Sequence, residues 1–128
     1  EKEEFLLDFI VKIIILLLKE YQVNVPIHRV SKLKEQGYDI SGTKSDLIVK
    51  MCEVVKANNF IFGTLGRTYM NKKTFEDNNI NYYFQNFKHP KYKQLQGEFV
   101  SNMSSIDLLF NHGKDSIEIL GRSQGDTE

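Results

Sequence analysis

The chain has 128 residues, of which 41% are hydrophobic and 12% aromatic, and its 17 Lys and Arg residues balance 17 Asp and Glu residues. This composition predicts one folded domain and excludes a chain that is disordered throughout. A net charge of zero argues against a nucleic-acid-binding protein, because such proteins draw their affinity from a surplus of cations. The single cysteine, Cys52, excludes an internal disulfide and a multi-cysteine metal site, and its apolar surroundings predict a buried, inert thiol.

Residues 3–21 predict a strongly apolar helix. Its polar side chains, Asp8, Lys12, Lys19 and Glu20, fall on one narrow stripe, so the helix is expected to be covered on most sides, either by the rest of the chain or by a part that is absent. Its uncharged runs are far shorter than the roughly 20 residues that span a bilayer. The acidic start does not resemble a signal peptide. We therefore expect no membrane span and a cytoplasmic protein.

The middle of the chain alternates between helix and strand patterns. Residues 23–30 are rich in β-forming side chains and predict a strand, although Pro26 cannot donate within a central ladder. A helix is predicted next, with Thr43 and Asp46 as a start that resembles a capping box and with the pair Asn58 and Asn59 as its end.

The second half continues this alternation. Strands are predicted over residues 59–63 and 80–87, a polar helix over 67–78, and a short helix over 104–111. Residues 116–120 fit either a helical turn or a strand, and residues 121–128 are expected to be a flexible tail. The order predicts an α/β fold in which helices pack around a small parallel sheet, followed by an irregular polar C-terminal part.

The sequence GTLGR follows the predicted strand 59–63. Gly63 and Gly66 permit a close backbone approach at a strand-to-helix turn, and Arg67 can bind a phosphate or carboxylate. These three residues are therefore candidate ligand-binding residues. The pattern is also compatible with a tight turn that places the arginine in solvent.

The stretch YYFQNFKHPKYKQLQGEF is the second candidate site. His89 is suited to act as a general base near neutral pH, and Glu98 could orient it or act as an acid. Lys88, Tyr92 and Gln94 are candidate ligand-binding residues in the same segment. The alternative is that His89 opens an extended turn and that the aromatic residues belong to the core.

The third candidate is SNMSSIDLLFNHG. Ser105, Asp107 and Asn111 could face a pocket, or Ser104 and Asp107 could simply cap a helix. His28 and His112 have no partners at metal-ligand spacing, so neither a metal site nor a cofactor is expected.

The segment FKHPKYKQLQGEFVSNMSSIDLLFNHGKDSIEIL closely resembles the C-terminal signature of the WbqC-like protein family. The upstream segments SGTKSDLIVKMCEVV and FGTLGRTYM also resemble the family, with Thr64 and Leu65 in place of its usual Pro-Gly. The signature positions present are His89, Pro90, Tyr92, Gln94, Leu95, Gly97, Phe99, Ser104, Ile106, Asp107, Leu108, Leu109, Phe110, Asn111, Gly113 and Ser116.

The resemblance implies that residues 1–128 are the C-terminal portion of a single WbqC-like domain whose N-terminal segment is absent and would be a partner of this part. It also implies a role in bacterial or archaeal surface-polysaccharide (O-antigen type) biosynthesis. We expect a small-molecule partner, a sugar nucleotide or another anionic ligand, and group transfer such as N-acylation. His89, Glu98 and Asp107 are the expected catalytic residues. The alternative is a noncatalytic binding or scaffolding subunit of the same pathway.

Overall fold

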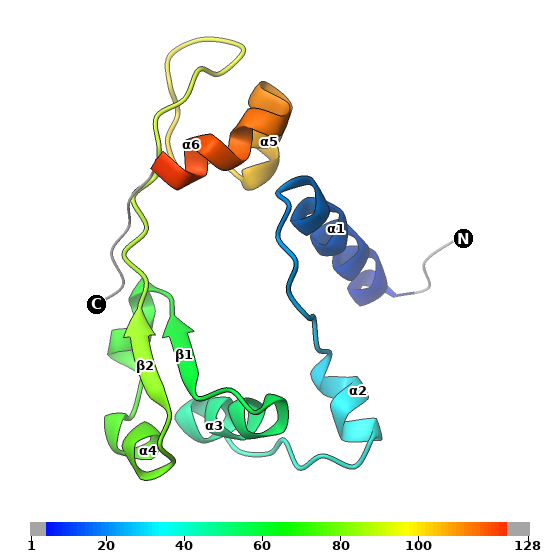
Figure 1. The fold of residues 1–128 in the computed structure, drawn as a ribbon, viewed down its shortest axis with the longest axis vertical. Helices are drawn as coiled ribbons and strands as arrows, with labels where there is room; N and C mark the ends of the chain where they lie inside the picture. Colours follow the sequence, from blue (N-terminus) through cyan, green and yellow to red (C-terminus); the bar gives the residue numbers. More distant parts are fainter. Residues whose placement is uncertain (1–4, 123–128) are drawn as a thin grey trace. The chain divides into compact units, whose positions relative to one another are not determined.

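The computed structural model describes residues 5–122, which form two compact units (Figure 1). We call the part made of residues 27–87 the central unit. The other part combines residues 5–26 with residues 88–122, and we call it the flanking unit. Each unit is described by itself.

The central unit contains a small sheet and short helices. Its strands, β1 and β2, run parallel in register, so that Phe60 lies opposite Tyr82 and Phe62 lies opposite Phe84. This arrangement confirms the predicted α/β class. The elements of the unit, in chain order, are α2 (Val30–Glu35), α3 (Lys44–Val55), β1 (Asn59–Phe62), the 3-10 helix η1 (Thr64–Thr68), α4 (Lys72–Asp77) and β2 (Asn81–Phe84).

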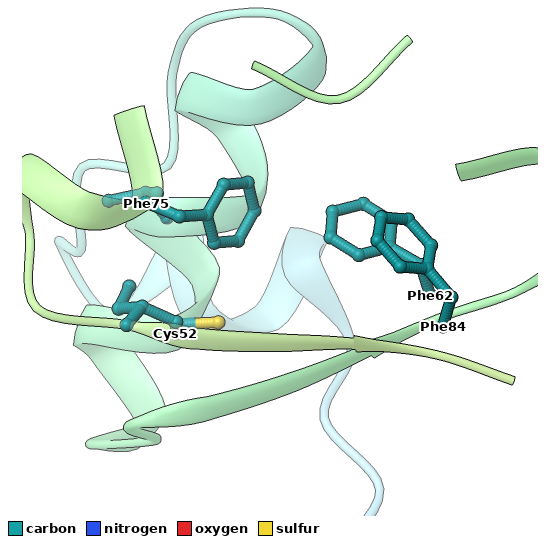
Figure 2. Close-up of a cluster of buried hydrophobic side chains, with 6 residues drawn as sticks. Cys52, Phe62, Phe75 and Phe84 are labelled. Carbon is teal, nitrogen blue, oxygen red and sulfur yellow. The ribbon is translucent and has the colours of Figure 1, made fainter. Parts of the chain in front are cut away.

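An aromatic core fills the space between the sheet and the helices α3 and α4. The ring of Phe75 is fully buried and lies 5.3 Å from that of Phe62, which stacks on Phe84 at 5.4 Å (Figure 2). Cys52 lies in the same cluster, and burial, followed by the charge of Glu53, raises the pKa of its thiol. The prediction of a buried thiol is therefore confirmed.

The flanking unit is helical. Its elements are α1 (Leu6–Glu20), α5 (Ser105–His112), the 3-10 helix η2 (Gly113–Asp115) and α6 (Ser116–Arg122). Residues 88–104 lead into α5 without regular structure, which fits the predicted irregular C-terminal part. Within residues 5–122, no helix combines the length and the apolar character needed to cross a membrane.

The described residues do not cover the first helix, so of the two expected sources of cover, the rest of the chain does not supply it within residues 5–122; cover by an absent part stays a prediction. None of the α1 side chains is buried, and Leu6 is 74% exposed. A groove of about 510 Å³ lies between α1 and α5, with Leu17 and Leu109 among its lining residues. The helices α5 and α6 have only 8 and 7 residues, so they cover one side of α1 at most.

Two predictions in the first half of the chain are wrong. Residues 23–29 form no strand, and Val30 already begins α2, because Pro26 lacks an N–H and no described strand pairs with this segment. Thr43 does precede α3, but its side chain makes no capping hydrogen bond. The helix ends at Val55 rather than at the two asparagines, since Lys56 adopts a left-handed backbone with φ +57°.

In the second half, the two predicted strands are confirmed in shorter form. The predicted helix over residues 67–78 is divided into η1 and α4 by Asn71, whose side chain caps α4 by accepting a hydrogen bond from the Lys73 N–H. The helix predicted at residues 104–111 is confirmed, with Ser104 as its cap, and the segment 116–120 is helical. Of the predicted tail, residues 121 and 122 complete α6, and the rest lies outside the described residues.

Candidate functional site

The carboxylate of Asp107 accepts hydrogen bonds from two polar side chains of the flanking unit. It lies in the first turn of α5, where a negative charge complements the helix dipole. The Tyr92 hydroxyl donates to Asp107 Oδ2 at 2.8 Å, and Gln94 Nε2 donates to the same oxygen at 3.1 Å. We call these three residues the Asp107 cluster. It joins two of the three sequence candidates, the loop before α5 and the start of α5.

Tyr92 is the buried member of this cluster. Its ring lies 5.8 Å from that of His89, 5.4 Å from that of Phe99 and 5.6 Å from that of His112. Burial and the hydrogen bond to Asp107 raise the pKa of the Tyr92 phenol. The phenol is therefore protonated at neutral pH and acts as a hydrogen-bond donor to the carboxylate.

Gln94 closes the loop that follows Tyr92. Its Nε2 donates to the Val100 carbonyl at 3.0 Å, and its Oε1 accepts from the Val100 N–H at 2.8 Å. Gly97 permits the turn between them, because its φ of +71° is a conformation that residues with a Cβ rarely adopt. The carboxamide thus fixes the loop and the Asp107 carboxylate together.

His89 is half-buried beside Tyr92 and Phe99. Its Nδ1 lies 2.9 Å from the Pro90 carbonyl oxygen. A carbonyl only accepts, so Nδ1 carries the hydrogen, and in the neutral ring Nε2 carries the lone pair. This tautomer is the one that a general base acting through Nε2 requires.

His112 is a positioning residue that sequence reasoning missed. Its Nε2 donates to the Lys93 carbonyl at 2.8 Å, which ties the loop to the end of α5. Its place before Gly113, at a helix end, was the available signal, because side chains there often bind nearby carbonyls.

Other predicted residues of the flanking unit have structural contacts or face solvent. Asn111 donates to the Asp107 carbonyl at 2.7 Å, and the Ser105 carbonyl accepts from the Tyr21 hydroxyl at 2.5 Å. The side chains of Lys88 and Glu98 are exposed. The ligand-binding and catalytic roles given to these residues remain predictions.

The turn at residues 63–67 belongs to the central unit. Gly66 is required there for space, since a Cβ at this position would lie 2.5 Å from Phe62 Cβ, whereas a Cβ at Gly63 would meet no atom within 4 Å. The Arg67 guanidinium is exposed and lies 4.4 Å from the centroid of the Phe84 ring, a cation–π contact. The anion-binding role expected for Arg67 remains a prediction.

The turn and the Asp107 cluster lie in different units, so a combined site built from both remains a prediction. Among residues 5–122, no group of three or more His, Cys, Asp and Glu side chains is arranged to hold a metal ion.

The chain is similar to the uncharacterized protein Rv1507c of Mycobacterium tuberculosis (strain ATCC 25618 / H37Rv), with 29% identity over 84 residues. This match covers 65% of the chain but only 36% of the relative, so the chain spans about a third of the relative's length. No solved structure gives a significant match. The profile of the WbqC-like protein family matches residues 1–119. A match over this much of the chain establishes that the protein belongs to the WbqC-like family.

Proposed function

We propose that the protein acts in bacterial or archaeal surface-polysaccharide biosynthesis, as part of an enzyme that transfers an acyl group to a nucleotide-activated amino sugar. The observation that supports this proposal is the series of contacts from the His89 ring to the Tyr92 ring and on to the Asp107 carboxylate. It combines a candidate base with a fixed polar cluster beside an exposed, irregular loop, and such loops commonly carry function.

In the proposed reaction, the sugar amine attacks the carbonyl carbon of an acyl thioester. A C–N bond forms, the C–S bond breaks, and the thiolate leaves. His89 Nε2 takes the proton of the amine and passes it to the thiolate, so that no charge is left over. Glu98 orients the imidazolium, and the Asp107 cluster holds the loop that carries His89.

The test is an acyl-transfer assay of the purified protein with UDP-activated amino sugars and acetyl-coenzyme A. Loss of a general base commonly costs about 10²–10⁴-fold in rate, and we expect that loss for His89→Ala. The matched control is His28→Ala, because His28 is exposed and outside the candidate sites, so its removal should leave the rate unchanged. Activity that survives His89→Ala would show that the role assigned to His89 is wrong.

A second candidate is a noncatalytic ligand-binding or scaffolding subunit of the same pathway. This candidate is supported by the hydrogen bonds that Asp107 accepts. Tyr92 and Gln94 both donate to the same carboxylate oxygen, and these bonds connect the loop to α5. In this case His89→Ala and Asp107→Ala should change the affinity for a sugar nucleotide, or the stability, with no turnover to lose. Titration calorimetry with the same UDP-sugars, beside the acyl-transfer assay, distinguishes the two candidates.

A further inference from the structure

The groove between α1 and α5 in the flanking unit is lined by one apolar face of each helix. On both helices the lining residues are spaced i, i+3 and i+4, and this spacing places side chains on the same side of a helix. The two faces are tied together at one point, because the Tyr21 hydroxyl donates to the Ser105 carbonyl. The six apolar side chains of the lining are Ile13, Leu16, Leu17, Ile106, Leu109 and Phe110.

The polar part of the lining is small and neutral overall. Glu20 and Lys114 are its charged residues, and their charges are opposite, so the groove favours an uncharged ligand over an ion. Much of the apolar wall is in contact with water, since Phe110 is 82% and Leu16 is 56% exposed. A ligand that covers this wall gains the free energy of removing apolar surface from water. A volume of about 510 Å³, apolar walls and few polar groups are typical of small-molecule sites between helices.

A polypeptide fits this groove poorly. A helix with a diameter of 10 Å would fill about 510 Å³ with only about one turn of its length. This limit applies equally to a helix from a second copy of the chain. An extended segment fits no better, because its backbone N–H and C=O groups would need partners. The walls are helices, whose backbone groups are bonded internally, and six of their side chains are apolar.

We propose that the groove between α1 and α5 binds the hydrocarbon chain of an acyl thioester, the donor of the proposed transfer. A hydrocarbon chain has no polar group to satisfy, and the thioester that ends it is uncharged. The inference rests on the proposed function for the choice of a thioester. It adds that the donor carries a chain longer than acetyl, since two carbons leave most of the groove unfilled.

The proposal is tested by calorimetric titration of the protein, expressed with its entire natural polypeptide. The probes are the N-acetylcysteamine thioesters of butanoic, hexanoic and octanoic acid. We expect Kd to fall about fourfold for each methylene group that enters the groove. The heat capacity change of binding should be negative and should grow with chain length, because apolar surface is buried.

A matched pair of substitutions locates the binding site. Phe110 lines the groove and is 82% exposed, so Phe110→Gln removes part of the wall without opening a core. We expect it to weaken binding of the octanoyl thioester about tenfold. The control is Leu95→Gln, because Leu95 is 83% exposed in the same unit and lies outside the groove. Its affinity should equal that of the unmodified protein.

NMR of the unmodified protein gives a test that needs no variant. The chain of the octanoyl thioester should show nuclear Overhauser contacts to the methyl groups of Leu17 and Leu109. The proposal is overturned if Kd does not change with chain length, if Phe110→Gln and Leu95→Gln bind alike, or if the contacts are to other residues.

The titrations contain no sugar acceptor, so they separate this inference from the proposed reaction. Chain-length-dependent binding without any acyl transfer would support the groove as a binding site and count against the reaction. Transfer from acetyl-coenzyme A without chain-length-dependent binding would support the reaction and overturn the role of the groove.

Discussion

Each of the two units is stabilised internally by a different kind of interaction. The central unit encloses a cluster of buried side chains in which the rings of Phe62, Phe75 and Phe84 contact one another. In the flanking unit, the described residues bury little more than Tyr92, Leu108 and Ser116, and side-chain hydrogen bonds to Asp107 and to backbone carbonyls join its segments.

This difference separates a scaffold from a candidate site. Apolar burial is non-directional and tolerates small shifts, whereas a hydrogen bond requires a defined distance and angle. A loop fixed by Tyr92, Gln94 and His112 therefore holds its polar groups in defined positions, which is what binding or catalysis requires. The cost is a unit with a small core, which should open more easily than the central unit.

The largest effect is expected when the core of the central unit is truncated. Phe75 is 0% exposed, so Phe75→Ala should lower the free energy of unfolding by about 3–5 kcal/mol. Urea unfolding followed by circular dichroism measures this loss. The control is Leu65→Ala, since Leu65 is 74% exposed and its truncation should cost less than about 0.5 kcal/mol. Equal losses in the two variants would contradict an aromatic core as the source of stability.

An intermediate effect is expected at the Asp107 cluster. Asp107→Ala removes the acceptor of two hydrogen bonds, one of them from the part-buried Tyr92 hydroxyl, at a cost of about 1–3 kcal/mol. The loss should appear as faster amide exchange in α5, with the strands of the central unit unchanged. Asp115→Ala, at an exposed position, is the matched control. Uniform destabilisation of both units would argue against separate modes of stabilisation.

The smallest effect is a pH dependence. The folded protein raises the pKa of Tyr92 above its ordinary value of 10.0, so above that pH the folded state keeps a proton that the unfolded state has lost. The free energy of unfolding should therefore fall as pH rises beyond 10.0, and more steeply in the unmodified protein than in Tyr92→Phe. Tyr21, whose pKa is also raised, is present in both proteins. Identical slopes would exclude a contribution from Tyr92.

Local patterns predicted the elements that depend on local chemistry. The cap at Ser104 and the strand at residues 59–63 were found because one uses a side-chain acceptor and the other a short apolar run. The strand at residues 23–30 was predicted wrongly, since β propensity has no effect without a neighbour to pair with. Which elements pack against α1 depends on the tertiary structure, and the sequence of this one helix does not determine it.

The same limit applies to the candidate site. Tyr92, Gln94 and Asp107 were all named from the sequence, but their convergence on one carboxylate oxygen follows from the path of residues 88–104, which has no periodicity to interpret. His112 was overlooked because only its place before Gly113, at a helix end, pointed to a carbonyl partner, and the path of the loop decides that this partner is Lys93.

The discontinuous flanking unit has a consequence for how the protein is made. The hydroxyl of Tyr21 bonds to a residue 84 positions later, whereas the described part of the central unit is one continuous segment. Closing such a long loop carries an entropic cost that short-range contacts avoid. During synthesis on a ribosome, the central unit can therefore fold before α5 has been synthesised. Until then, α1 lacks its partner helix. Because α1 exposes apolar side chains during this interval, this is the stage at which binding by a chaperone would most reduce aggregation.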